Sequence, residues 1–402
     1  MRFAVTNHVR AIGLALALVT LALAACATTP ERARAARGME IGLWDDPVFR
    51  DQSYFNREKA LSQARSLGVT RLRVAANWAF FLSRSQQKAK HKPAGVAYNF
   101  TALDSTINAA AAHGIRVYIS VQGPAPAWAA GNHKLGNYKP SQKEFAIFTS
   151  ALAHHEKGRV DRYSIWNEPN WKTWLAPMSS APAQYRGLYT RGYKAIKSND
   201  PKAKVLIGET APYAQKGRAT APIKFLRSMA CLNSKYKRVH KCTKLKADGY
   251  AHHPYYFQKA PNFKYPGADN ATMGTLSHLT RALDRISRTG QLRRNGGGKL
   301  GLYLSEFGYF SSGHRALSRS KRGKYLAQGF KMALKNGRVK QQLQYELVQP
   351  PKHSSFAFFD LGLESKSGHK QPQFNSLASF FKKYKSKVKR PGGAISLPPP
   401  TP

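Results

Sequence analysis

Two glutamates in this sequence each follow a short apolar run with the composition of a β-strand. Glu168 lies in the segment WNEPN, directly after YSI, and Glu306 lies in SEFG, directly after LYL. The two glutamates are 138 positions apart, about half the length of a typical (β/α)₈ barrel. Two carboxylic acids that face each other are the catalytic groups of glycoside hydrolysis. Cleavage of a glycosidic bond is therefore the first chemistry to consider.

The elements that must position these glutamates form a regular alternation from residue 40 onward. Strands are expected at 40–44, 71–75, 116–121, 162–166, 204–208, 249–252, 300–305 and 342–348. Helices are expected at 57–66, 103–113, 142–155, 183–197, 223–231, 276–288, 321–336 and 374–384. Such alternation predicts a parallel sheet, and eight units predict an α/β fold, a single-domain (β/α)₈ TIM barrel. An open doubly wound sheet is the rival, but its usual glycine-rich phosphate loop is missing after the first strand, where the sequence is DDPV.

The carboxyl ends of the strands carry the active site in a barrel. Strand four ends in Asn167 and Glu168, strand seven ends at Glu306, and strand two carries Arg73. Strands four and seven lie three positions apart in the ring, so their glutamates can approach to about 5–5.5 Å, the separation of a retaining glycosidase. One carboxyl must hold a proton and the other must be ionised, and a nearby cation such as Arg73 favours the ionised form.

The order of these motifs resembles glycoside hydrolase clan A, above all its cellulase-like family five and its xylosidase-like family thirty-nine. The resemblance spans roughly residues 41–380 and rests on NEP after strand four, HxY after strand six and the lone glutamate after strand seven. It implies a retaining glycosidase in which Glu168 is the general acid/base and Glu306 is the nucleophile. It also implies that Asn167 bonds the sugar 2-hydroxyl and that Arg73 lies near the nucleophile.

The HxY motif corresponds to His253 and Tyr255 as substrate-binding residues, although His252 allows a shift of one position. Two features depart from the resemblance. Gln122 stands near the end of strand three, where the cellulase-like families often carry histidine. No tryptophan follows strand eight, where those families commonly carry one. Tyr345, Phe358 or Phe359 are the aromatic residues that can substitute for it. These departures leave the sugar specificity open.

Glu209 also follows an apolar run, VLI. A salt bridge to a basic residue is the favoured interpretation, and a contact to substrate is the alternative.

Six tryptophans all fall at or just beyond the ends of predicted strands: Trp44, Trp78, Trp128, Trp166, Trp171 and Trp174. An aromatic face combines apolar area with a polar edge, which suits a sugar ring. We expect substrate contacts from Trp78, Trp128, Trp171 and Trp174. Barrel packing is the alternative for Trp44 and Trp166.

The chain begins with the pattern of an export signal over residues 1–27. Arg2 and Arg10 precede an apolar run at 12–25, and small residues follow it. The segment LAAC resembles a bacterial lipobox with Cys26 as the lipidated residue, and ordinary cleavage nearby is the alternative. A linker at 28–39, the barrel at 40–385 and a tail at 386–402, basic and then proline-rich, complete the expected organisation. The tail is expected to be disordered, and the protein to be extracellular or at the cell surface.

Two further cysteines, Cys231 and Cys242, predict a disulfide in an exported chain, with two free thiols as the alternative. Closing this short loop would stabilise the fold by roughly 3 kcal/mol. No further ligands stand at zinc-like spacing, so neither a metal nor a cofactor is expected.

The chain is strongly basic, with 65 Lys and Arg against 20 Asp and Glu and a formal net charge of +45. Such a field attracts polyanions, including anionic cell-wall polymer and membrane surfaces, whereas a merely solvated basic surface is the alternative. Nothing resembles a nucleic-acid-binding module, so no specific nucleic-acid partner is expected. The sequence therefore predicts an exported retaining glycoside hydrolase that degrades a poly- or oligosaccharide. The alternatives are a transglycosylase with the same glutamates and a non-catalytic barrel that binds carbohydrate or anionic polymer.

Overall fold

Eight parallel strands close into a barrel in the order β1-β10-β9-β7-β5-β4-β3-β2. The computed structural model describes residues 38–402, so the predicted export signal and most of the predicted linker lie outside the described residues. The barrel strands are β1 (Glu40–Trp44), β2 (Arg71–Asn77), β3 (Arg116–Gln122), β4 (Arg162–Ile165), β5 (Lys204–Thr210), β7 (Gly249–His252), β9 (Leu302–Leu304) and β10 (Val339–Tyr345). The predicted (β/α)₈ fold is confirmed.

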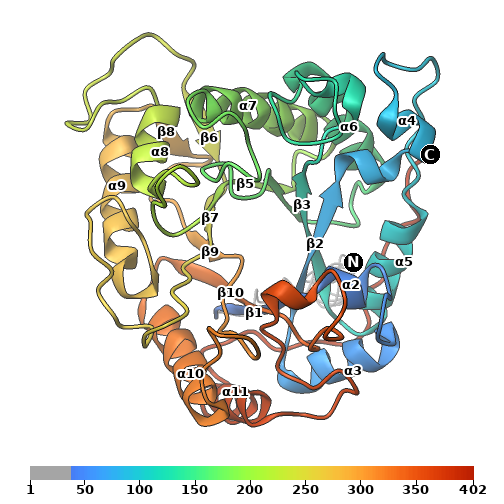
Figure 1. The fold of residues 1–402 in the computed structure, drawn as a ribbon, viewed down its shortest axis with the longest axis vertical. Helices are drawn as coiled ribbons and strands as arrows, with labels where there is room; N and C mark the ends of the chain where they lie inside the picture. Colours follow the sequence, from blue (N-terminus) through green and yellow to red (C-terminus); the bar gives the residue numbers. More distant parts are fainter. Residues whose placement is uncertain (1–37) are drawn as a thin grey trace, which may run out of the picture. The chain divides into compact units, whose positions relative to one another are not determined.

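Helices surround the strands (Figure 1). The long ones are α3 (Arg57–Leu67), α5 (Thr101–Ala112), α6 (Gln142–His155), α7 (Ala181–Asn199), α8 (Pro222–Met229), α9 (Leu276–Arg288), α10 (Arg319–Lys335) and α11 (Pro372–Lys383). Short helices α2 (Asp46–Phe49) and α4 (Arg84–Lys88) lie in loops. Local sequence signals set the helix ends. In α3, the Asn56 side chain caps the first turn, and Gly68 with φ 93° ends the helix in a left-handed conformation. None of the helices in residues 38–402 combines the length and the apolar character needed to span a bilayer.

Two three-residue strands, β6 (Leu245–Ala247) and β8 (Leu292–Arg294), pair with each other outside the barrel. They are too short to show a periodic pattern in the sequence, which is why no element was expected there.

Glycines allow the barrel interior to close. A Cβ at Gly42 of β1 would lie 2.6 Å from the Leu343 side chain, and one at Gly249 of β7 would lie 2.3 Å from the Tyr303 ring. Both distances are far inside van der Waals contact, so each glycine leaves room for the large side chain of a neighbouring strand.

The barrel interior is built in layers from the amino to the carboxyl ends of the strands. At the amino ends, Glu40 accepts hydrogen bonds from Arg71 at 3.1 Å and Arg162 at 2.5 Å. Burial alone would raise the pKa of Glu40, but the two arginines hold it well below its usual range. A buried apolar cluster follows, formed by Tyr118, Leu206, Ala251, Tyr303 and Leu343. The polar groups of the carboxyl ends thus rest on a packed layer.

The last barrel strand, β10, begins and ends three residues before the expected segment at 342–348. Its sequence, VKQQLQY, is rich in glutamine, and Gln341, Gln342 and Gln344 are all buried. Gln341 accepts a hydrogen bond from Arg162 in the interior. Polar side chains inside the barrel therefore obscured the start of this strand, and the expected bounds were displaced by three residues.

The segment 386–402 lies against the helical layer, which corrects the expectation of a disordered tail. The backbone oxygen of Pro398 accepts a hydrogen bond from Arg159 at 2.9 Å, and the Thr401 backbone bonds His155 in both directions. Leu397 packs against the hydrophobic core. Proline has little conformational freedom to lose, so ordering this segment costs less than its composition implies.

Cys231 and Cys242 form the predicted disulfide, with their Cα atoms 6.6 Å apart. The bond closes the loop that follows α8.

Candidate active site

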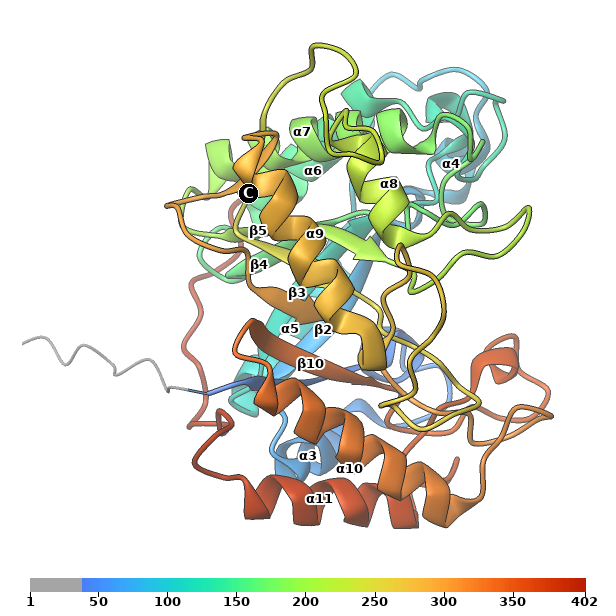
Figure 2. The same cartoon turned by 90° about the vertical axis from the view of Figure 1, so that its left-hand side faces the viewer.

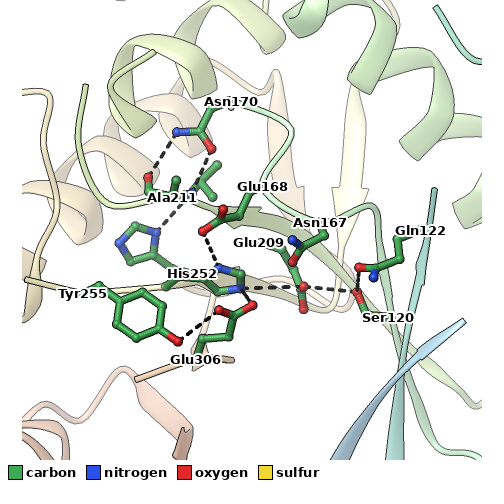
Figure 3. Close-up of polar contacts among 12 residues, drawn as sticks. Ser120, Gln122, Asn167, Glu168, Asn170, Glu209, Ala211, His252, Tyr255 and Glu306 are labelled. Atoms are coloured by element: carbon green, nitrogen blue, oxygen red, sulfur yellow. Dashed lines mark hydrogen bonds and ion pairs between the residues drawn. The ribbon is translucent and has the colours of Figure 1, made fainter. Parts of the chain in front are cut away.

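Glu168 and Glu306 converge at the carboxyl ends of β4 and β9 (Figure 3). One carboxylate oxygen of each glutamate and a ring nitrogen of His253 lie within 4.8 Å of one another. Inverting glycosidases hold their carboxyl groups about 6.5–9.5 Å apart to admit a water molecule. The observed spacing is too short for that arrangement and suits direct attack on a sugar carbon.

The turn that carries Glu168 has an unusual backbone. Trp166 and Glu168 both have positive φ, 66° and 35°, in a region that bulky residues rarely adopt. Hydrogen bonds hold the turn in place: Trp166 N donates to Val121 O at 2.7 Å and Glu168 N donates to Glu209 O at 2.9 Å. Such strain is typical of functional sites, and here it aims the Glu168 carboxyl at the barrel mouth.

Glu306 is buried and is held by two donors. Arg73 Nη1 donates to its Oε1 at 2.8 Å, and the Tyr255 hydroxyl donates to its Oε2 at 3.0 Å. Burial raises the pKa of Glu306 to about 7, while the charges of His253 and Arg73 oppose that rise. Burial and the Glu306 charge raise the pKa of Tyr255 well above its ordinary value, so its hydroxyl keeps its proton and continues to donate.

His253 lies between the two glutamates. Its Nδ1 is 2.9 Å from Glu168 Oε1, and its Nε2 is 3.2 Å from Glu306 Oε1 in an ion-pair contact without good hydrogen-bond alignment. Burial alone would lower the pKa of His253, but the charges of Glu306 and Glu168 raise it to about 9. His253 is therefore a cation at neutral pH.

His252 has a different role, which settles the choice between the two histidines. It contacts Thr210 Oγ1 at 2.9 Å and the Ala271 carbonyl at 2.6 Å, away from both glutamates. Burial lowers its pKa to about 3, so it is neutral. His253, and not His252, belongs with Tyr255 in the site.

Arg73 links the site to the barrel interior. Its Nη2 donates to Asn167 Oδ1 at 2.8 Å and to the Glu209 carboxylate. Because Asn167 Oδ1 accepts from Arg73, its amide nitrogen is the group left to donate to a sugar hydroxyl.

Glu209 forms the salt bridge that was favoured for it. It is fully buried and accepts hydrogen bonds from Arg73, Tyr118, Ser120 at 3.1 Å and Ser164 at 2.8 Å. Nothing in the sequence marked Tyr118, Ser120 or Ser164 as partners of Glu209, apart from their positions on predicted strands.

The charges of the cluster nearly cancel. Arg73 and His253 supply two positive charges against the carboxylates of Glu209 and Glu306. These four charges offset one another in a buried setting, where a net charge is costly.

Two clusters in residues 38–402 have ligand atoms close enough for a metal ion. In the first, Glu168, His253 and Glu306, the oxygens of Glu306 are already held by Arg73 and Tyr255, so an ion would have to displace these donors. In the second, Asp104, His155 and Glu156, the Arg159 guanidinium already pairs with both carboxylates. Neither cluster offers a vacant set of ligands.

The position of Trp78 does not favour the substrate contact that was expected of it. It is fully buried and stacks on Phe148 of α6 with ring centroids 6.2 Å apart. The chain turns outward after β2, so the ring enters the layer between strands and helices. Trp128 is half-buried; its ring packs edge-to-face on Trp78 with the centroids 6.0 Å apart, and its Nε1 donates to Gln86 O.

Trp171 and Trp174 are half-buried in the turn after Glu168, and Trp171 N donates to Glu168 O at 2.8 Å. Sugar contacts from Trp128, Trp171 and Trp174 stay predictions. Trp44, set aside as packing, contacts the site: the Arg73 guanidinium lies 4.0 Å from the centre of its ring. Trp44 is the last residue of β1, and that position at the carboxyl end of a barrel strand could have indicated its place near the site.

Aromatic rings lie beside Tyr255 in the segment after β10, where the tryptophan is missing. Phe359 lies 5.9 Å from Tyr255 and 5.5 Å from Tyr345, measured between ring centroids, whereas Phe358 is 78% exposed. Gln122, at the histidine position, donates to Asn77 Oδ1 at 2.7 Å.

Comparison with known proteins extends this picture. The profile described as cellulase (glycosyl hydrolase family 5) matches residues 30–264, more than half of the chain. A comparison with curated proteins gives no significant match.

Solved structures share the fold. A family 39 glycoside hydrolase from the gut symbiont Bacteroides cellulosilyticus WH2 has a TM-score of 0.63 at 18% identity, over 86% of this chain and 64% of that chain. A monomeric beta-xylosidase from Caulobacter crescentus CB15 has a TM-score of 0.54 at 18% identity, over 86% and 69%. Xylanase 10B from Thermotoga petrophila RKU-1 has a TM-score of 0.55 at 17% identity, over 86% and 95%. The chain thus spans less than two thirds of the length of the family 39 enzyme.

A barrel with paired glutamates at the ends of its fourth and seventh strands is the arrangement of glycoside hydrolases with a (β/α)₈ fold. Within that class, the chain belongs to the cellulase family, glycosyl hydrolase family 5.

Proposed function

We propose that this protein is an exported retaining glycosidase that cleaves a poly- or oligosaccharide by double displacement, with Glu306 as nucleophile and Glu168 as general acid/base. The observation that carries the proposal is the approach of the two carboxylates to within 4.8 Å, with Arg73 and Tyr255 both donating to Glu306. Export is inferred from the signal pattern of residues 1–27.

In the first step, a Glu306 oxygen attacks the anomeric carbon and the bond to the leaving oxygen breaks. Glu168 gives its proton to that oxygen, so the aglycone leaves as an alcohol and a glycosyl ester remains on Glu306. The negative charge of the Glu306 carboxylate is lost as the ester forms, and a negative charge appears on Glu168 as it gives up its proton. Arg73 and Tyr255 fix the carboxylate in one orientation before attack, which lowers the entropic cost of reaction.

In the second step, the ionised Glu168 takes a proton from water, and the hydroxide attacks the anomeric carbon to release Glu306. Two displacements at one carbon leave its configuration unchanged. Asn167, held by Arg73, is placed to donate to the sugar 2-hydroxyl, an interaction that strengthens in the transition state. His253 contacts both glutamates and balances whichever one is negative.

A trapped intermediate tests the proposal directly. We expect activated 2-deoxy-2-fluoro glycosides, offered as a panel of glucoside, xyloside and mannoside, to add one sugar mass to the protein. Peptide mapping by mass spectrometry should place the label on Glu306. A label on another residue, or turnover without a trapped species for every sugar that is cleaved, would contradict the assignment, and the reactive sugar would also define the specificity.

The pH dependence of kcat/KM provides a second test. Burial raises the pKa of Glu306 to about 7, so activity should rise as the pH increases through this range and the nucleophile ionises. His253 lowers the pKa of Glu306, so His253→Gln should raise that pKa further and move the acidic limb of the profile to higher pH. For a rise of about one pKa unit, the variant should lose about tenfold in activity at pH 6 and almost none at about pH 9, since one pKa unit corresponds to tenfold.

His240→Gln is the matched control, because His240 is exposed and lies outside the site. Its profile should coincide with that of the unmodified protein. An acidic limb that stays in place in His253→Gln, or moves to lower pH, would show that His253 does not act on Glu306 in this way.

A barrel that binds carbohydrate without cleaving it is the second candidate, favoured by the high positive charge. An activity screen on aryl glycosides and polysaccharides separates the two, because the second candidate requires salt-sensitive binding with no cleavage. Product analysis separates hydrolysis from transglycosylation by the same residues.

A further inference from the structure

An open cavity of about 660 Å³ lies between α8 and α9, on the outside of the barrel. The two helices run side by side on the flank that Figure 2 shows toward the viewer. Ala214 and Asn270 line the cavity at one end, and Ala214 N donates to Asn270 Oδ1 at 3.0 Å. They belong to the loops after β5 and β7, the second of which also carries His253 and Tyr255. The cavity is thus bordered by a loop of the active site.

One face of α9 supplies the cationic side of the cavity. His278, Arg281 and Arg285 all line it, and their spacing of three and four residues places them on one side of a helix. Arg281 and Arg285 are both exposed. Neither has a carboxylate or hydrogen-bond partner among residues 38–402, although the chain's acids pair widely elsewhere.

The ring of Tyr236 holds the Arg285 guanidinium in place. Arg285 lies 3.9 Å from the centre of the Tyr236 ring. Arg227 of α8 pairs with Asp269 through two hydrogen bonds of 2.6 and 2.7 Å, which neutralises the single acid that lines the cavity. Stacking on tyrosine orders the Arg285 side chain and leaves its N–H groups free to donate at their edges.

The loop closed by the Cys231–Cys242 disulfide adds further positive charge beside the cavity. It carries Lys235, Lys237, Arg238 and Lys241 with no acidic residue, and its Ser234 and Tyr236 line the cavity. The four basic side chains are exposed. Two arginines next to this loop, of which Arg285 is oriented by Tyr236, offer the N–H donors that bind carboxylate oxygens.

We propose that this cavity is an accessory site for an acidic polysaccharide, in which Arg281 and Arg285 bind carboxylate groups of uronic acid units. This inference rests on the proposed function for the choice of a saccharide over other polyanions. An acidic glycan held here would lie beside the loops that border the catalytic glutamates, so the site would concentrate acidic polymer at the enzyme.

The test is binding of oligogalacturonate by the purified full-length protein, measured by calorimetry at low and moderate salt. The double variant Arg281→Gln/Arg285→Gln should raise the Kd at least tenfold and reduce the dependence of log Kd on log salt concentration. The matched control is Arg191→Gln/Arg319→Gln, which removes two exposed arginines from α7 and α10 and changes the net charge equally. Its Kd should change less than threefold.

Equal weakening in both double variants would overturn the proposal, because binding would then depend on net charge alone. The same holds if a neutral xylo-oligosaccharide binds as tightly, or if duplex DNA or anionic phospholipid vesicles bind more tightly through the same two arginines. Calorimetry measures binding and does not require cleavage. A negative result here is therefore distinguishable from a negative result in the trapping experiment at Glu306.

Discussion

Replacing Glu306 by glutamine is expected to lower kcat by roughly 10⁴-fold or more on every glycoside that the protein cleaves. Glutamine keeps the shape of the side chain but has no carboxylate oxygen with which to form the glycosyl ester. The amide keeps one acceptor oxygen, so its NH₂ group faces one of the two donors, Arg73 or Tyr255, that now bond a carboxylate oxygen. Steady-state kinetics on an aryl glycoside identified by the trapping panel measures the effect.

Glu58→Gln is the matched control, because Glu58 is an exposed glutamate of α3 that pairs with His113. It should retain full activity. Circular dichroism should show that both variants are folded, and a Glu306→Gln variant within tenfold of the unmodified rate would refute the nucleophile assignment.

Replacing Glu168 by alanine should produce a different defect, which depends on the leaving group. Substrates with a poor leaving group need protonation and should lose roughly 10³-fold or more in kcat/KM. Activated aryl glycosides need little acid assistance, so their first step should be nearly normal and the glycosyl-enzyme should accumulate. Sodium azide should then restore turnover, because this anion attacks without a general base.

The configuration of the azide product distinguishes the two glutamates. In Glu168→Ala, azide attacks the ester from the Glu168 side, so two displacements give a glycosyl azide with retained configuration. In Glu306→Ala, azide enters from the other side in a single displacement, and the configuration is inverted. Nuclear magnetic resonance of the products reads the outcome. The same configuration from both variants would contradict their positions on opposite faces of the sugar.

The fold and the two glutamates could be predicted because both depend on strong local signals. Short β-rich runs alternate with amphipathic runs, and parallel strands in a closed ring bring their carboxyl ends together whatever the loops between them do. Glu168 and Glu306 could therefore be placed near each other from their positions after strands. Arg73 could be placed near them from its position on strand two, whereas Asn167 and Tyr255 were assigned to the site by the resemblance to clan A; all three converge there.

Other features depend on contacts that distant segments make, and these could not be predicted. The direction in which Trp78 points is set by the turn after β2 and by the packing of α6. The glutamines of β10 are interior residues because their places in the closed barrel decide it, and only there does Gln341 meet Arg162 of β4. The choice between His252 and His253 needed the irregular pairing of β5 with β7, where the register shifts between Gly208 and Thr210.

The segment 386–402 has a consequence for how the enzyme would be presented at a surface. Its first part joins the start of the barrel, where Met39 pairs with Val388 and donates to Lys387 O at 3.1 Å. This junction lies at the amino ends of the strands, opposite the catalytic glutamates. The described part of the chain consequently begins on the face of the barrel that lies opposite Glu168 and Glu306. Tethering at that point would leave the mouth of the barrel open to large polymers.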